Sequence, residues 1–321
     1  MRLYDVPLLD LGKLANYQPV AVGAFVIAYA LVFVLYLSAY RAARQMDGVR
    51  DLWLVLGCTL VLCSILLWVY PLGANDVYDY IFRAREWVVY DYNPLVVRPD
   101  QLSADPWYPF VVWTWAASPY GPLWTYVSYA LYRLAGDDWL RNLVAFKLLA
   151  VLCIVVCSSL IYALVRTRGK GTAVAVVLLF AWNPLLLFES VVNGHNDVLM
   201  MTGVLGALWL YTRRRFTLAL VAGVLAALVK VSALVVVPVL FVACVRAMRE
   251  SGKGAGQSGA VSAPLRGVSR LLNRGSGPAR VFSFGVSTVT LCLAIVAVLY
   301  APCLAQRTLH DLGGGHRQAC A

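Results

Sequence analysis

An acidic residue, Asp76, lies where an apolar run long enough to cross a bilayer has just ended. It belongs to the segment Asn75-Asp76-Val77-Tyr78-Asp79-Tyr80. A carboxylate at a partly dry membrane interface has a raised proton affinity and can take a proton from a hydroxyl group. The position therefore predicts a general base that works at the membrane surface. The alternative is that Asp76 and Asp79 begin a helix and complement its dipole.

A second polar group interrupts the apolar sequence at Asn193-Gly194-His195-Asn196-Asp197, and Glu189 precedes it by about one helical turn. A tight polar turn would explain the motif alone, but an acid inside an apolar run is costly in lipid. We interpret His195, Asn196, Asp197 and Glu189 as substrate-binding residues suited to sugar hydroxyls. A divalent metal bound by Glu189, His195 and Asp197 is conceivable, but we expect neither a metal nor another cofactor.

Three basic residues could bind a phosphate group. Lys230 lies in the middle of an apolar run, where its ammonium either reaches back to the membrane surface or pairs with a lipid-linked phosphate. Arg83 and Arg85 follow Asp76 closely and could serve likewise, or could bind anionic lipid headgroups.

Aromatic residues are concentrated between these polar groups, and Tyr120 is the one that we assign to the substrate. Such a concentration is typical of an interfacial aromatic belt, but flat rings also stack on sugars and cover isoprenoid chains. The set is Trp87, Tyr90, Tyr92, Trp107, Tyr108, Trp113, Trp115, Tyr120 and Trp124.

The composition indicates an integral membrane protein. Of 321 residues, 61% are hydrophobic and only 13% are charged, against about half and a quarter in soluble domains. The net charge of +11 is spread over basic clusters between apolar runs, so we expect membrane lipid and not nucleic acid as a partner. Most of the eight cysteines lie in apolar runs without a C-x-x-C pair, which argues against structural zinc or a disulfide framework.

The elements that must position these residues are helices. The apolar runs predict an all-α, polytopic membrane protein with roughly eight spans and interfacial helices in the first large external loop. We divide the chain into an N-terminal tail (1–18), a transmembrane domain (19–302) and a flexible tail (303–321). Within the domain, 73–118 forms the external loop and 246–280 a basic cytoplasmic loop.

Basic residues in short loops orient the chain, because such loops face the cytoplasm. The clusters at 41–50, 166–170, 213–215 and 246–280 then place the polar groups together on the extracytoplasmic side. This requires Leu218–Val245 to form two short helices that meet near Lys230. It also suggests that Tyr120–Ala135 is a re-entrant or surface helix.

The order of these motifs resembles the GT-C membrane glycosyltransferases, and in particular the bacterial polyprenol-phosphomannose-dependent α-1,6-mannosyltransferases. The similarity covers about Leu52 to Pro302. The motifs that carry it are Asn75-Asp76-Val77-Tyr78-Asp79-Tyr80, Tyr92-Asn93-Pro94, Ser118-Pro119-Tyr120-Gly121-Pro122-Leu123, Trp182-Asn183-Pro184-Leu185, Asn193-Gly194-His195-Asn196-Asp197, and Leu228-Val229-Lys230 with Pro238.

The resemblance implies that Asp76 is the catalytic carboxylate. It implies an inverting transfer of a hexose, in particular mannose, from a polyprenyl-phosphate donor to a glycan or glycolipid acceptor in the cell envelope. Asp79 occupies a position that is more often basic in the family, so no role is carried onto it. Family members continue through further spans, so the resemblance implies a shortened form here. The alternatives are a transporter or flippase for lipid-linked sugars and a non-catalytic assembly subunit.

Overall fold

The computed structural model describes residues 10–46, 48–168, 170–257 and 278–313, and these residues are helical with no β-strand among them. The first half of the chain comprises α1 (Leu11–Leu14), α2 (Pro19–Ala43), α3 (Val49–Leu66), α4 (Asp76–Tyr90), the 3-10 turns η2 (Pro99–Leu102) and η3 (Tyr108–Phe110), α5 (Pro122–Ala135) and α6 (Trp139–Val165). The second half comprises η4 (Arg166–Arg168), α7 (Lys170–Ala181), α8 (Pro184–Leu187), the π-helical turn η5 (Phe188–Val192), α9 (Asp197–Thr212), α10 (Phe216–Val229), η6 (Val231–Val235), α11 (Val236–Gln257) and α13 (Pro278–Gly313).

Five of the described helices are long and apolar enough to cross a membrane, and the bent pair formed by 172–181 and 184–192 raises this to six. The two shorter apolar helices are α9 and α10. The all-α polytopic architecture is therefore confirmed. The number of crossings, roughly eight, stays a prediction.

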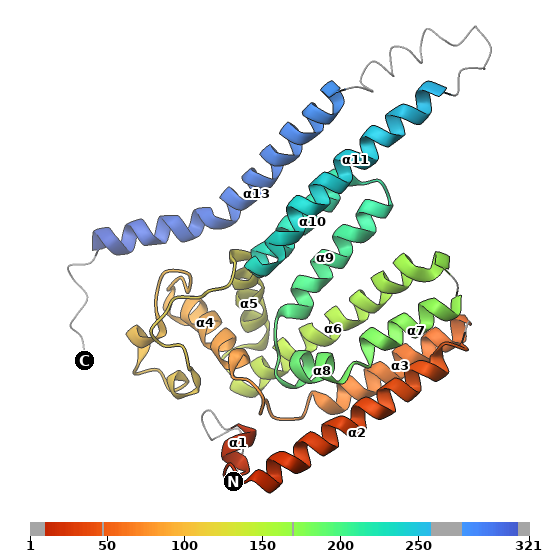
Figure 1. Ribbon diagram of the computed structural model, residues 1–321. Coiled ribbons are helices and arrows are strands. Elements are labelled where there is room, and N and C mark those ends of the chain that lie inside the picture. The colour runs from red at the N-terminus through yellow and green to blue at the C-terminus, as the bar shows by residue number, and fades with distance from the viewer. Residues whose placement is uncertain (1–9, 47, 169, 258–277, 314–321) are drawn as a thin grey trace.

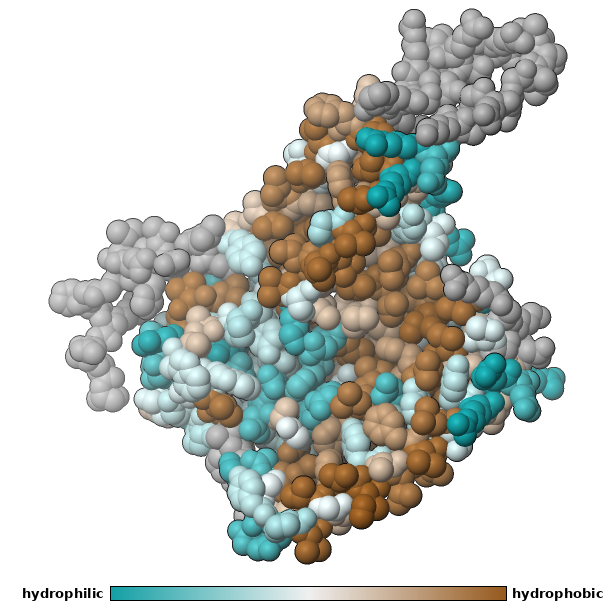
Figure 2. Space-filling view, viewed as in Figure 1, coloured by the Kyte–Doolittle hydropathy of each residue, from teal (hydrophilic) through white to brown (hydrophobic). Residues whose placement is uncertain are grey.

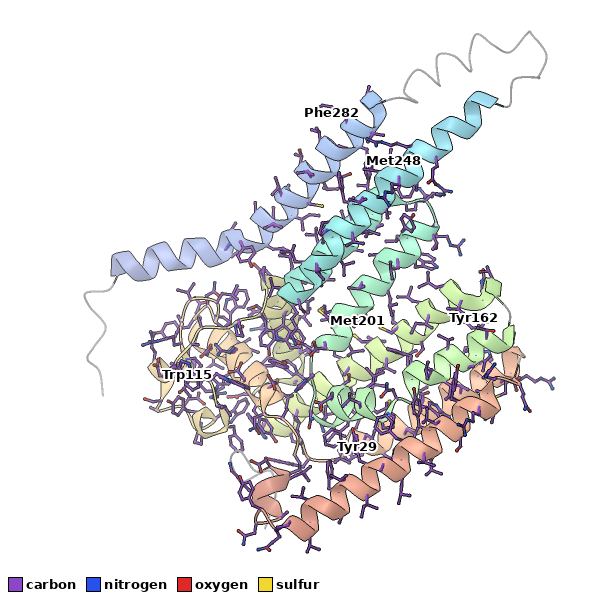
Figure 3. The ribbon with its side chains drawn as sticks, viewed as in Figure 1. Tyr29, Trp115, Tyr162, Met201, Met248 and Phe282 are labelled. Atoms are coloured by element: carbon purple, nitrogen blue, oxygen red, sulfur yellow. The ribbon has the colours of Figure 1, made fainter. Side chains whose placement is uncertain are left out.

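Two regions of the surface differ in polarity. Side chains of α2 and of residues 281–302 of α13 are mostly exposed and apolar, as lipid-facing helices require. Figure 2 shows hydrophobic residues over α9, α10 and α11, and more polar residues over the α4–α5 segment. Side chains crowd around this segment, which carries Trp115, whereas Phe282 on α13 stands apart (Figure 3).

The basic connections lie together at one end of the bundle. Helices α2, α6 and α9 end on the side away from α4 and α5, so the basic residues at 44–46, 166–168 and 213–215 share that side (Figure 1). This is the separation of basic connections from the α4–α5 segment that the positive-inside pattern predicts.

The predicted break in Leu218–Val245 is present. Helix α10 ends at Val229, Lys230 adopts an extended conformation (φ −146°, ψ 124°), and η6 follows before α11. Lys230 is thus the C-cap of α10: its N–H donates to the carbonyl of Ala226 at 3.1 Å, and its own carbonyl accepts from the N–H of Ala233 in η6 at 3.1 Å.

Helix α5 lies within the stretch Tyr120–Ala135, and its predicted re-entrant or surface position in the membrane stays a prediction. It is only 14 residues long, and it packs against α4, α6 and α10 through Trp124, Thr125, Ser128 and Tyr132, which are buried. One face of α5 is therefore packed against protein.

Helices extend into two segments that we predicted as a loop and a tail, and the division of the chain into these segments stays a prediction. Helix α11 continues to Gln257 and α13 begins at Pro278, so the basic segment 246–280 is partly helical. Helix α13 also continues to Gly313, through Pro302, where we expected an unstructured tail. Within the N-terminal tail, α1 forms a short helix that Asp10 caps. Residues 1–9, 258–277 and 314–321, which complete these predicted segments, lie outside the described residues.

Candidate active site

Asp76 is the first residue of α4, and the start of that helix is fixed from two directions. Lys147 of α6, which is fully buried, donates from Nζ to the carbonyls of Leu67 (3.3 Å) and Val69 (2.6 Å) in the connection from α3. The N–H of Gly73 donates to Asn193 Oδ1 at 3.1 Å. Both contacts satisfy backbone groups that the irregular connection would otherwise leave unpaired.

The residues 193–197 meet α4 because of a π-helical turn. In η5 the N–H of Asn193 donates to the carbonyl of Phe188 (2.9 Å) and that of His195 to the carbonyl of Glu189 (3.0 Å). Such turns widen a helix and often occur at functional sites. Gly194 follows with a φ of +72°, and a Cβ there would lie 2.8 Å from Val77 Cγ2. Glycine is therefore required for the chain to pass so close to α4.

Asp76 is held at both carboxylate oxygens. His195 Nε2 lies 3.2 Å from Oδ2, and the Tyr120 hydroxyl donates to Oδ1 at 3.3 Å. The Asp76 and His195 side chains are 21% and 23% exposed, so the pair is half-buried but open to a ligand.

The charge around His195 is mostly negative. Its Nδ1 lies 3.8 Å from Glu189 Oε2 and 3.9 Å from Asp197 Oδ2. Burial alone would lower the pKa of His195, but the carboxylates of Asp76, Glu189 and Asp197 outweigh it and raise that pKa above its ordinary value. The imidazolium form is thereby favoured.

The pKa of Asp76 corrects our expectation. Burial raises the pKa of this carboxyl, but His195, the Tyr120 hydroxyl and Lys230 together bring it below its ordinary value. We predicted a raised proton affinity from the dry interface alone, and the partners reverse the direction. Asp76 is therefore ionised at neutral pH.

Lys230 completes the group of residues that we call the Asp76 cluster: Asp76, Tyr120, Glu189, His195, Asn196, Asp197 and Lys230. Its Nζ donates to Asp197 Oδ1 (2.7 Å) and Oδ2 (2.9 Å) and lies 6.0 Å from the centre of the Tyr120 ring. Lys230 thus pairs with a carboxylate, and the interpretation as a lysine that only reaches the membrane surface does not account for this pair. The side chains of Lys230 and Asp197 are 32% and 44% exposed.

Asn196 is buried, with neither amide atom hydrogen-bonded within the described part of the chain. Leaving a buried amide unpaired costs about 1–3 kcal/mol. The side chain is thus available to a ligand. Glu189, by contrast, accepts a hydrogen bond from Asn193 Nδ2 at 2.9 Å.

The structure does not bring Arg83 and Arg85 to this cluster. Arg83 Nε pairs with Asp79 Oδ2 at 2.7 Å, and its Nη2 donates to the carbonyls of Trp113 and Ala116. Arg85 pairs with Asp105 (2.7 Å) and Asp137 and lies over the Trp107 ring. Both side chains are buried, and their predicted phosphate-binding role stays a prediction.

No group of three or more His, Cys, Asp and Glu side chains suited to a metal ion occurs within the described ranges. The expectation that no metal or other cofactor is needed stays a prediction.

Comparison with known proteins decides the family. The family described as "Alpha-(1->6)-mannopyranosyltransferase, N-terminal domain" matches residues 3–246. The chain belongs to this family. All residues of the Asp76 cluster lie inside the matched range, as do the resemblance motifs.

Two curated relatives are similar to the chain. Alpha-(1->6)-mannopyranosyltransferase A of Corynebacterium glutamicum is 24% identical over 62% of this chain and 40% of its own length. A "probable alpha-(1->6)-mannopyranosyltransferase" of Mycolicibacterium smegmatis is 29% identical over 44% of this chain and 26% of its own length. The chain thus spans less than half the length of these mannopyranosyltransferase-family relatives. No solved structure matches it.

Proposed function

We propose that the protein transfers mannose, with inversion, from a polyprenyl-phosphate donor to a glycan or glycolipid acceptor, and that Asp76 is the base. The observation that carries this proposal is the arrangement of Asp76. Its two oxygens are held by His195 and Tyr120 at the mouth of an apolar helix bundle, in a chain of the α-(1→6)-mannopyranosyltransferase family.

In the proposed step the acceptor hydroxyl gives its proton to Asp76 while its oxygen bonds to the anomeric carbon. The bond from that carbon to the phosphate oxygen breaks, and the electron pair leaves with the phosphate. A carboxylate with a low pKa suffices, because the hydroxyl becomes acidic as its oxygen bonds to carbon. The base carboxylate in inverting glycosidases is likewise the one that stays ionised.

The cations of the cluster would stabilise the leaving phosphate. Lys230 lies 6.0 Å from the centre of the Tyr120 ring, and its partner Asp197 is 44% exposed, so a phosphate could replace that carboxylate. Asn196 and Glu189 would bind sugar hydroxyls, and Asp197, once the phosphate displaces it from Lys230, would bind hydroxyls of the acceptor. The Tyr120 ring would contact the sugar or the prenyl chain.

We infer that this site faces the extracytoplasmic side, since the basic connections lie at the other end of the bundle. A membrane-impermeant maleimide should label Trp115→Cys in intact cells, because this side chain is 62% exposed. Arg214→Cys is the matched variant for the opposite end. If only Arg214→Cys is labelled more strongly than the chain without an added cysteine, the proposed orientation is wrong and the site faces the cytoplasm.

The activity itself is tested with purified protein in lipid vesicles. Polyprenyl-phosphate mannose should support mannose transfer to an oligosaccharide acceptor, whereas a nucleotide-linked mannose should not. The α-(1→6) linkage of the product is checked by linkage analysis. If the donor crosses the vesicle membrane but no mannose is transferred, the flippase interpretation is favoured. If the donor binds but is neither moved nor used for transfer, the assembly-subunit interpretation is favoured.

A further inference from the structure

Tyr80 is a buried hydroxyl directly behind the candidate base. It lies one turn into α4, is 2% exposed, and donates from its hydroxyl to the Tyr120 hydroxyl at 3.2 Å. The two rings meet edge-to-face with their centres 5.1 Å apart. A buried hydroxyl without a partner would be costly, so this hydrogen bond fixes Tyr80 against Tyr120.

Tyr120 is fixed from a second direction by its neighbour in sequence. The Gly121 N–H donates to the carbonyl of Val229 at 3.2 Å, and a Cβ on Gly121 would lie 2.0 Å from the carbonyl oxygen of Leu228. The backbone therefore approaches the end of α10 as closely as glycine allows. Tyr120 is held between Asp76 on α4 and Lys230 at the end of α10.

The direction of the hydrogen bonds follows from counting protons. A tyrosine hydroxyl has one proton and can accept from another donor. Asp76 is ionised and can only accept, so Tyr120 gives its proton to Asp76 Oδ1 and accepts the proton of Tyr80. Hydrogen bonds in such chains strengthen one another.

We infer that Tyr80 is a positioning residue for the proposed transfer: through Tyr120 it orients the Asp76 carboxylate and stabilises its charged, proton-accepting form. This inference rests on the proposed function. Tyr80 would not touch substrate, because Tyr120 lies between it and Asp76.

Core packing alone would require the ring of Tyr80 but not its hydroxyl. The ring packs against Trp124 and Phe146, with centres 4.9 and 6.4 Å away. Phenylalanine would preserve these contacts, so Tyr80→Phe removes only the hydrogen bond.

The groups around Asp76 decide whether its pKa rises or falls in a tyrosine variant. The charged and titratable side chains that face it or its partners come from α4 (Asp79), η5 and the following turn (Glu189, His195), the start of α9 (Asp197) and the end of α10 (Lys230). None of these changes in a tyrosine variant. Loss of the Tyr120 hydroxyl then removes one contribution that lowers the Asp76 pKa, and that pKa must rise.

The experiment compares Tyr80→Phe, Tyr120→Phe and the double variant in lipid vesicles. We expect the acid limb of the pH profile of kcat/KM to move to higher pH in Tyr120→Phe, by about half a pH unit, and in Tyr80→Phe by less. The double variant should match Tyr120→Phe, because the two hydroxyls act in series. The donor KM should stay unchanged while kcat falls.

Tyr132→Phe is the matched control. Tyr132 is also buried on α5, but its hydroxyl bonds to Arg85 and Asp137. Its removal should lower thermal stability and leave the pH profile in place. An unchanged profile in Tyr80→Phe, or additive shifts in the double variant, would overturn the inference.

A second measurement separates this inference from the proposed function. The infrared carboxyl band lost in Asp76→Asn reports the protonation of Asp76 directly, with or without turnover. If the wild-type protein transfers mannose but this band titrates identically in Tyr80→Phe, only the role of Tyr80 is overturned. If the wild-type protein transfers no mannose, the proposed function is overturned and the inference with it.

Discussion

Helix α4 contributes residues to two groups of charged side chains that differ in burial. In the Asp76 cluster the paired charged side chains are 21–44% exposed. Further along the helix, Arg83 and Arg85 pair with Asp79 and Asp105 at exposures of 0–9%. We call this second set, with Glu86 and Tyr132, the α4 network; Arg85 also pairs with Asp137, which is 58% exposed and is not counted in the network. Carboxylates thus pair with His195 and Lys230 in the exposed group and with arginines in the buried group.

The difference separates a site from a scaffold. Exposed ion pairs contribute roughly 0–1 kcal/mol, so a ligand can replace one partner at little cost. A buried pair cannot exchange, because removing one partner leaves an uncompensated charge at a cost of about 3–5 kcal/mol. The α4 network therefore fixes the loop 91–121 against α4 and α5, while the Asp76 cluster keeps charges that can change partner.

The largest expected effect is loss of turnover on removing the base. Asp76→Asn keeps the size of the side chain but cannot accept the proton. Turnover should fall by roughly 10²–10⁴-fold, with donor binding and thermal stability retained. Turnover at the wild-type rate would place the base elsewhere and break the contrast between the two groups.

Arg85→Met should act on folding instead. It leaves Asp105, which is fully buried, without its 2.7 Å partner, and a loss of about 3–5 kcal/mol of stability is expected. The measurement is thermal unfolding in detergent together with specific activity. A stable Arg85→Met protein with weakened donor binding would return Arg85 to the phosphate role that the sequence suggested.

The sequence predicts one of these groups better than the other. Asp76, His195 and Lys230 stand out because polar residues interrupt apolar runs, and the structure brings them within contact of common partners. Arg83 carried a local signal that we did not use, since it lies four residues after Asp79 and such pairs meet on a helix. Arg85 carried none, because Asp105 and Asp137 lie 20 and 52 residues away.

Other features needed the tertiary structure. The proximity of His195 to Asp76 depends on the π-helical turn and on Gly194, and neither follows from hydropathy. Lys147 lies within an apolar run as Lys230 does, and the same argument would have singled it out. Its two carbonyl acceptors, however, are visible only once α3 and α6 are packed.

Glu86 gives the α4 network a pH dependence. Neither carboxyl oxygen has a hydrogen-bond partner among the described residues, and burial raises its pKa from 4.5 to about 8. The raised value favours the neutral folded form, so stability is full below pH 4.5 and is lost as pH rises towards 8. The slope is about 1.4 kcal/mol per pH unit. Glu86→Gln should flatten the dependence of thermal stability between pH 5.5 and 7.5, and parallel curves for both proteins would contradict this.

Lys230→Met should weaken donor use roughly tenfold or more, because the phosphate loses a charge-assisted partner. Folding should be preserved, since the pair with Asp197 is exposed. Lys230→Arg should be intermediate, as charge remains but shape changes. The measurement is donor KM with unfolding as control, and unchanged KM in Lys230→Met would leave the arginines of α4 as phosphate partners.

The smallest expected effect tests whether the cluster exchanges partners. If the donor phosphate displaces Asp197 from Lys230, then Asp197→Asn removes a competitor and should lower the donor KM by about two- to fivefold, the range of an exposed pair. Glu189→Gln is the matched variant. Glu189 lies 3.8 Å from His195 and Asp197 lies 3.9 Å from it, so both variants remove a carboxylate at nearly the same distance. In the described part of the chain, however, Lys230 pairs with Asp197 and not with Glu189. If only the loss of a negative charge matters, both variants should change the donor KM equally. If the phosphate replaces Asp197 at Lys230, the change should be larger in Asp197→Asn. A raised donor KM in Asp197→Asn would show that this carboxylate contacts the donor itself, and the pair with Lys230 would then be as fixed as those of the α4 network.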